Sequence, residues 1–135
     1  MTNKEKIAEA YRLWHETKGG SVNRWLDLAH DDVQCWSIAE GAHGLDFTEN
    51  CTCKADFERY FSGITKDWEL IHYTVDRLFE DGEEIVALGR CAFRYKKNGA
   101  ELETPKADFF TMRDGKIAEF REFYDTAKVA SATGT

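Results

Sequence analysis

The chain has 135 residues, 42% of them hydrophobic and only one a proline, which predicts a single compact domain. Its formal net charge of -7 disfavours nucleic acid or an anionic membrane surface as a partner. No apolar run approaches the roughly 18 residues of a membrane span, and the N-terminus starts an amphipathic helix pattern instead of a signal sequence. We therefore expect a cytoplasmic protein with no membrane partner.

The first half of the chain shows helical periodicity. Ile7, Ala10, Tyr11 and Trp14 recur at spacings of three and four, which predicts a helix over residues 3–18. Ser21 has the chemistry of an N-cap and precedes the apolar residues of a short second helix that ends before Asp31.

A strand over residues 33–38 follows the second predicted helix. Residues 39–52 contain Gly41 and Gly44 and little periodicity, which predicts a loop that could act as a lid. A third helix is predicted over residues 54–61.

Three turn signals organise the second half of the chain. They are Asp81-Gly82, Asn98-Gly99 and Asp114-Gly115, and each lies between segments rich in β-branched and aromatic residues. They predict a four-stranded antiparallel meander with strands at 68–80, 83–97, 100–113 and 116–126. Strands this long curl strongly. The predicted fold class is therefore α+β, a cone-shaped curved antiparallel sheet, or half-barrel, packed against three N-terminal helices. The domain is expected to span residues 1–127 and to be followed by a flexible tail over 128–135.

The four cysteines favour reduced thiols over a disulfide framework. Cys35 and Cys91 lie in predicted strands, whereas Cys51 and Cys53 lie two apart in a predicted loop. Together with the four scattered histidines, they lack the paired spacing of a structural zinc site. We expect no metal site.

One carboxylate stands out in the strand predicted at 100–113. Strand alternation places it on the same face as Lys106 and Phe110, and the members of that face are Leu102, Thr104, Lys106, Asp108, Phe110 and Met112. Burial against Phe110 would favour the neutral form of Asp108, which could donate a hydrogen bond to a developing oxyanion. The alternative is an ordinary ion pair with Lys106 or Arg90.

The last strand carries charged and aromatic residues on both faces. Phe120, Glu122 and Tyr124 alternate with Glu119, Arg121, Phe123 and Asp125. We infer that one face lines a pocket and the other meets a helix or a second subunit. In the second case the protein would be a homodimer. A strand with one face in solvent is the alternative.

The segment Phe109–Asp125, together with Leu28–Val33, resembles the nuclear-transport-factor-2-like superfamily and is most similar to its SnoaL-like branch. The resemblance covers residues 5–127. It implies a cone of helices against a curved sheet and, in many members, a homodimer. The superfamily also contains ketosteroid isomerase, limonene epoxide hydrolase, scytalone dehydratase and polyketide cyclases, so the resemblance specifies the fold better than the reaction.

The resemblance also implies two catalytic candidates. Asp108 lies where the isomerases place the aspartate of their oxyanion hole. Asp125 matches the water-activating aspartate of limonene epoxide hydrolase and a similar acid or base in SnoaL-type cyclases. The chain departs from both patterns, because Ser37 stands nearest to the position of the isomerase base and the stretch Arg90–Arg94 lacks the aspartate of the hydrolase.

Two hypotheses for function follow. The first is an isomerase, cyclase or hydrolase that needs no cofactor and uses aspartate acid/base chemistry on a small cyclic hydrophobic substrate. The second is a module without catalytic activity that binds a small ligand or mediates dimeric association. The residues expected to line the pocket are Trp14, Trp36, His43, Arg90, Phe110, Glu122 and Tyr124.

Overall fold

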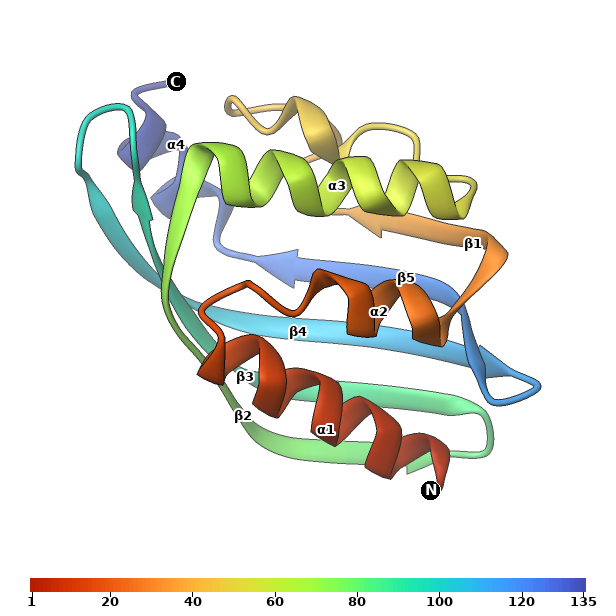
Figure 1. Ribbon diagram of the computed structural model, residues 1–135. Helices are drawn as coiled ribbons and strands as arrows, with labels where there is room; N and C mark the ends of the chain where they lie inside the picture. Colours follow the sequence, from red (N-terminus) through yellow and green to blue (C-terminus); the bar gives the residue numbers. More distant parts are fainter.

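The structure is a computed structural model that describes residues 1–135, and it contains four helices, one short 3-10 helix and a five-stranded sheet (Figure 1). None of its helices combines the length and apolar character that crossing a membrane requires. The elements are α1 (Asn3–Glu16), α2 (Val22–Leu28), β1 (Ala29–Ser37), η1 (Asp46–Thr48), α3 (Lys54–Asp67), β2 (Trp68–Asp81), β3 (Glu84–Tyr95), β4 (Glu101–Arg113), β5 (Lys116–Tyr124) and α4 (Thr126–Thr133).

The sheet has the strand order β1-β5-β4-β3-β2, so the predicted meander of four antiparallel strands is confirmed, as is the predicted α+β fold class. Strand β1 adds to the edge at β5 in parallel orientation. The long strands curve, and α1, α2 and α3 lie across one face of the sheet (Figure 1). Breaks in the pairing register of β2 with β3 support this curvature. At one of them, Gly89 passes so close to β2 that an added Cβ would overlap the Thr74 carbonyl oxygen.

Helix α1 buries the apolar face that its periodicity predicts, and a capping box formed by Thr2 and Glu5 fixes its start. Helix α3 continues to Asp67, six residues beyond its predicted end. Gly63 does not stop this helix. It makes room for Phe47, whose side chain would lie 2.3 Å from a Cβ at that position.

Residues 126–133 form helix α4, which covers most of the flexible tail that the sequence predicts over residues 128–135. The Asp125 carboxylate caps this helix by accepting hydrogen bonds from two backbone N–H groups. Val129 and Ala132 are buried in a small second core that also contains Leu45 and Trp68. The segment therefore folds because its few apolar residues meet the loop after β1 and the start of β2, a contact that local sequence does not reveal.

Cys35 and Cys51 form a disulfide, so the prediction of reduced thiols is wrong for this pair. An isolated bridge between the backbones of the two residues brings their Cα atoms to 4.8 Å. The disulfide ties β1 to the end of the loop that precedes α3. Cys53 and Cys91 are free.

Candidate functional site

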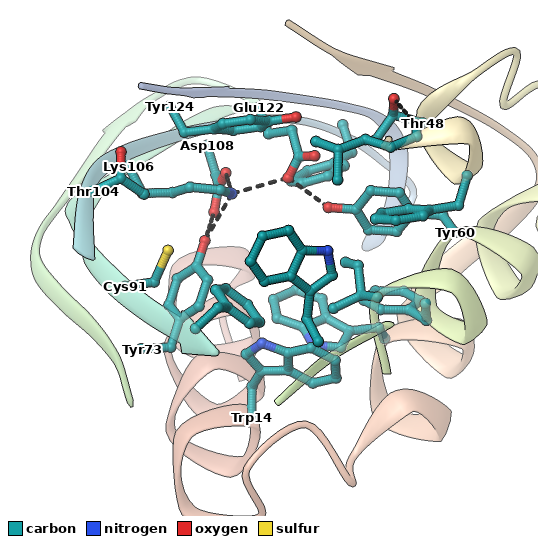
Figure 2. Close-up of a pocket in the computed structure, with 18 of the residues that line it drawn as sticks. Trp14, Thr48, Tyr60, Tyr73, Cys91, Thr104, Lys106, Asp108, Glu122 and Tyr124 are labelled. Atoms are coloured by element: carbon teal, nitrogen blue, oxygen red, sulfur yellow. Dashed lines mark hydrogen bonds and ion pairs between the residues drawn. The ribbon is translucent and has the colours of Figure 1, made fainter. Parts of the chain in front are cut away.

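A cavity of about 110 Å³ lies between the concave face of the sheet and the helices (Figure 2). Of the 23 residues that line it, 18 are hydrophobic, and many of these are aromatic. The loop predicted as a lid contributes Leu45, Phe47 and Thr48 to the wall. The cavity is thus an apolar chamber whose walls come from both halves of the chain.

Three charged side chains meet on the sheet side of this cavity. The Nζ atom of Lys106 lies 2.5 Å from Asp108 Oδ1 and 3.0 Å from Glu122 Oε2. Lys106 and Asp108 share a face of β4 because they are two residues apart, and Glu122 is the direct partner of Asp108 in β5. The exposed fractions of these side chains are 9% or less, so the cluster is almost completely withdrawn from water.

Tyrosine hydroxyls complete the charged cluster. Tyr11 of α1 and Tyr73 of β2 each donate a hydrogen bond of 2.5 Å to Asp108 Oδ2. Tyr60 of α3 donates one of the same length to Glu122 Oε2 (Figure 2). Asp108 thus accepts hydrogen bonds from three donors, which is the bonding pattern of a carboxylate and not of the neutral, donating carboxyl considered above. The predicted alternative, an ion pair with Lys106, is present inside the cavity.

Burial and charge together set the protonation of the groups around the carboxylates. Burial, and then the neighbouring negative charge of Asp108 or Glu122, raises the pKa of Tyr11, Tyr60 and Tyr73 well above the ordinary value. Burial alone would lower the pKa of Lys106, but the charges of Asp108 and Glu122 outweigh it and raise that pKa well above 10.5. At neutral pH the tyrosines are therefore neutral donors and Lys106 is an ammonium ion.

A buried thiol lies near the cluster. Burial is the main cause that raises the pKa of Cys91 to about 12. The thiolate, not the thiol, is the reactive form of cysteine. Cys91 therefore serves as a neutral wall of the cavity and not as a nucleophile.

The cavity brings together Asp108 and four of the residues that the sequence places in a pocket. Trp14, Phe110, Glu122 and Tyr124 all line it. The hydroxyl of Tyr124 also lies 2.6 Å from Ser37 Oγ, the buried residue where the isomerases would place their base.

Asp125 and Arg90 do not line the cavity. Asp125 follows the end of β5, and its carboxylate is engaged as the N-cap of α4. Arg90 lies next to the inward-facing Cys91, so it points to the outer face of the sheet, where it pairs with Asp76 at 2.9 Å and faces Glu103 at 3.7 Å.

Trp36 and His43 also lie outside the cavity. The indole of Trp36 donates a hydrogen bond to Glu40 and packs against Phe123, which alternates with the inward-facing Glu122. His43 lies in the loop after β1 with a φ of 58°, and its backbone carbonyl accepts a hydrogen bond from Thr133.

Sequence reasoning offered Lys106 only as the partner of Asp108 in the alternative ion pair, and it missed the roles of Tyr11, Tyr60 and Tyr73. The alternation of β4 did place Lys106 on the inward face, and a lysine among inward-facing residues signals a buried partner. The tyrosines carried no such signal, because a tyrosine on the apolar face of a helix or strand looks like core. No group of three or more histidine, cysteine or acidic side chains is arranged to hold a metal ion.

Solved structures share this fold over nearly the whole chain. An NTF2-like protein of unknown function from Burkholderia pseudomallei superposes with a TM-score of 0.82 at 18% identity, covering 100% of both chains. A putative isomerase from Bacillus subtilis gives a TM-score of 0.81 at 19% identity, covering 99% of this chain and 96% of the other. TerC, co-crystallised with polyporic acid, gives 0.80 at 18% identity over 98% of each chain.

At these identities the structural matches establish the fold alone, and no curated protein matches the sequence. The family model described as SnoaL-like domain matches residues 7–120, a span that contains the whole of β4 and most of the cavity wall. The chain therefore belongs to the SnoaL-like domain family.

Proposed function

We propose that this protein is an enzyme without a cofactor that moves a proton on a small cyclic hydrophobic molecule bound in the cavity. The observation that carries the proposal is the carboxylate of Glu122 in an apolar chamber. Its Oε2 atom is held by Lys106 and Tyr60, whereas its Oε1 atom has no hydrogen-bond partner. Figure 2 shows both interactions on a single oxygen of this carboxylate. A fixed carboxylate with one free oxygen has the form of a general base.

The other charged groups support Glu122. Lys106 holds the carboxylate at 3.0 Å, and its ammonium charge would stabilise negative charge that develops on a substrate. Asp108 in turn holds Lys106 and is itself fixed by two tyrosines from separate elements. Glu122 is thus the proposed catalytic group and Asp108 a positioning residue.

The volume and lining of the cavity support a ring-sized apolar substrate. An apolar cavity of about 150 Å³ binds benzene in another protein, and the present volume of about 110 Å³ is of that order. The polyporic acid bound to TerC supports a small-molecule ligand in a cone of this kind.

A second function, binding without catalysis, is favoured by a different observation. Lys106 donates hydrogen bonds to Asp108 and Tyr73 and forms an ion pair with Glu122, and the hydroxyls of Tyr11, Tyr60 and Tyr73 all donate to the two carboxylates. A network this complete can serve to fix the fold around a ligand pocket.

We also propose a homodimer formed through the outer face of the sheet. Phe109 is 38% exposed there and packs edge-to-face on Phe123, which in turn contacts Trp36. The guanidinium of Arg121 lies 5.4 Å from the centre of the Trp36 ring. An aromatic patch with a stacked arginine is typical of the residues enriched at protein interfaces.

Deuterium exchange separates catalysis from binding. Cyclohexanone, cyclohex-2-enone and 2-indanone would be incubated with the protein in D2O, and loss of their α-protons would be followed by proton NMR. An enzyme should accelerate exchange of at least one of them, and Glu122→Gln should reduce that rate by about 100-fold or more, within the range of general-base contributions. Glu103→Gln, the same change on the outer face, should leave the rate unchanged. A ring compound that binds without exchange would support the binding function instead.

A further inference from the structure

The charged cluster in the cavity carries an excess of one negative charge. Lys106, Asp108 and Glu122 are the only charged side chains among the residues that line the cavity, and one ammonium with two carboxylates has a formal charge of -1. The hydroxyls of Tyr11 and Tyr73 donate to Asp108 and so add no positive charge. A buried charge without a counterion is costly, so this site favours a positively charged partner.

The charged cluster keeps one hydrogen-bond acceptor without a partner. Lys106 donates hydrogen bonds to Asp108 and Tyr73 and forms an ion pair with Glu122, and each of the three tyrosines donates its hydroxyl proton to a carboxylate. Glu122 is 97% buried. Only two side-chain atoms, Ser21 Oγ and Trp25 Nε1, are both inaccessible to solvent and without a hydrogen-bond partner. Because Glu122 Oε1 has no partner and is not one of them, it is accessible to solvent. The open atom is therefore an anionic oxygen reached from the cavity.

Aromatic rings around the cluster also suit a cation. The Nζ atom of Lys106 already lies 5.4 Å from the ring centre of Tyr73 and 5.9 Å from those of Phe120 and Tyr124. Ring faces attract cations, and more strongly where water is excluded. A second cation at Glu122 Oε1 would lie within the same apolar chamber.

We propose that the ligand of this cavity is a single-ring organic cation with at least one N–H group, an ammonium or protonated imine that donates to Glu122 Oε1. This inference rests on the proposed function, since it names the ligand class of the same site. A carboxylate ligand would instead add a second negative charge beside Glu122. The cavity thus selects for charge and for an N–H group.

The test uses probes with the same ring and different head groups. Binding of benzylamine, benzyl alcohol, toluene, benzoate and benzyltrimethylammonium would be measured by calorimetry and thermal shift at pH 7. Benzylamine should bind at least tenfold more tightly than the other four, including benzyltrimethylammonium, which has the charge but no N–H group. Glu122→Gln should reduce benzylamine affinity at least tenfold, and Glu103→Gln should leave it unchanged.

Equal or tighter binding of benzyl alcohol, toluene or benzoate would overturn the inference, as would the absence of binding by benzylamine. If Glu122→Gln does not fold, the comparison of benzylamine with benzyltrimethylammonium on the unaltered protein still decides it. Selective benzylamine binding without deuterium exchange of any ring ketone would support the ligand class and count against the proposed enzyme. Exchange without benzylamine selectivity would overturn the ligand class alone.

Discussion

Replacement of Lys106 by methionine is the most direct test of the charged cluster. Methionine has a similar length and fills the same apolar space, so the change removes the ammonium and little else. It deletes the contacts of 2.5 Å with Asp108 and 3.0 Å with Glu122, as well as the 2.9 Å hydrogen bond to Tyr73. Two buried carboxylates would remain without a cation.

Two independent routes give the magnitude of this loss. Removing one partner from a buried ion pair typically costs about 3–5 kcal/mol of folding free energy. The variant can also respond by protonating one carboxyl group. At about 1.4 kcal/mol per pH unit, over the roughly three units between an ordinary carboxyl value and pH 7, this costs about 4 kcal/mol. We therefore expect Lys106→Met to lower the free energy of unfolding by about 3–5 kcal/mol at pH 7.

The loss should depend on pH with a defined sign. Protonation of the carboxyl becomes easier as pH falls, so the difference from the unaltered protein should narrow by about 2 kcal/mol between pH 7 and pH 5.5. The double variant Lys106→Met/Glu122→Gln removes one of the stranded charges and should recover part of the stability.

Urea unfolding followed by tryptophan fluorescence would measure all of these variants. Lys97→Met, at an exposed position in the hairpin between β3 and β4, is the matched control and should change stability by less than about 0.5 kcal/mol. A loss below about 1 kcal/mol for Lys106→Met, equal at both pH values and unaffected by Glu122→Gln, would refute the view that these charges depend on one another.

Four further predictions concern other parts of the molecule. Because the pKa of Tyr60 is raised in the fold, the contribution of Tyr60 to stability is complete below about pH 10 and is lost as pH rises through the folded pKa. Tyr60→Phe should therefore make the fall in unfolding free energy at alkaline pH shallower by about 1.4 kcal/mol per pH unit. An unchanged slope in alkaline urea titrations would contradict this. Cys35→Ser opens a loop with a sequence separation of 16 and should lower the free energy of unfolding by about 3 kcal/mol in chemical denaturation. Reduction of the unaltered protein should have the same effect. A decrease of less than about 1 kcal/mol, on the order of a single hydrogen bond, would count against a structural disulfide. Gly63→Ala, which would stabilise an ordinary helix, should instead lower the melting temperature, because the new Cβ displaces Phe47; a higher melting temperature would show that the loop yields freely. Phe109→Glu should convert the proposed dimer to a monomer in light scattering, and a monomeric unaltered protein would end that proposal.

Local pattern was sufficient for most of the architecture. The three turn dipeptides delimit β2 to β5, because each supplies residues suited to a left-handed backbone between segments that favour strands. The period of two in β4 also identified the inward face that carries Asp108, and the spacing of Ile7 and Trp14 identified the buried face of α1. Such periodicity is visible because it repeats within one element.

The identity of partners was not visible in the same way. Whether Asp108 meets Lys106, Arg90 or solvent depends on the register of β4 with β3 and β5 and on where α1 and α3 dock. These contacts join residues up to 97 positions apart. The same reason explains the disulfide and the helix α4, since each is stabilised by a segment distant in the chain. Sequence periodicity determines which side of an element faces inward. The free energy of burying charge, which depends on the assembled neighbours, determines how those side chains are paired and which oxygen of Glu122 keeps no hydrogen-bond partner.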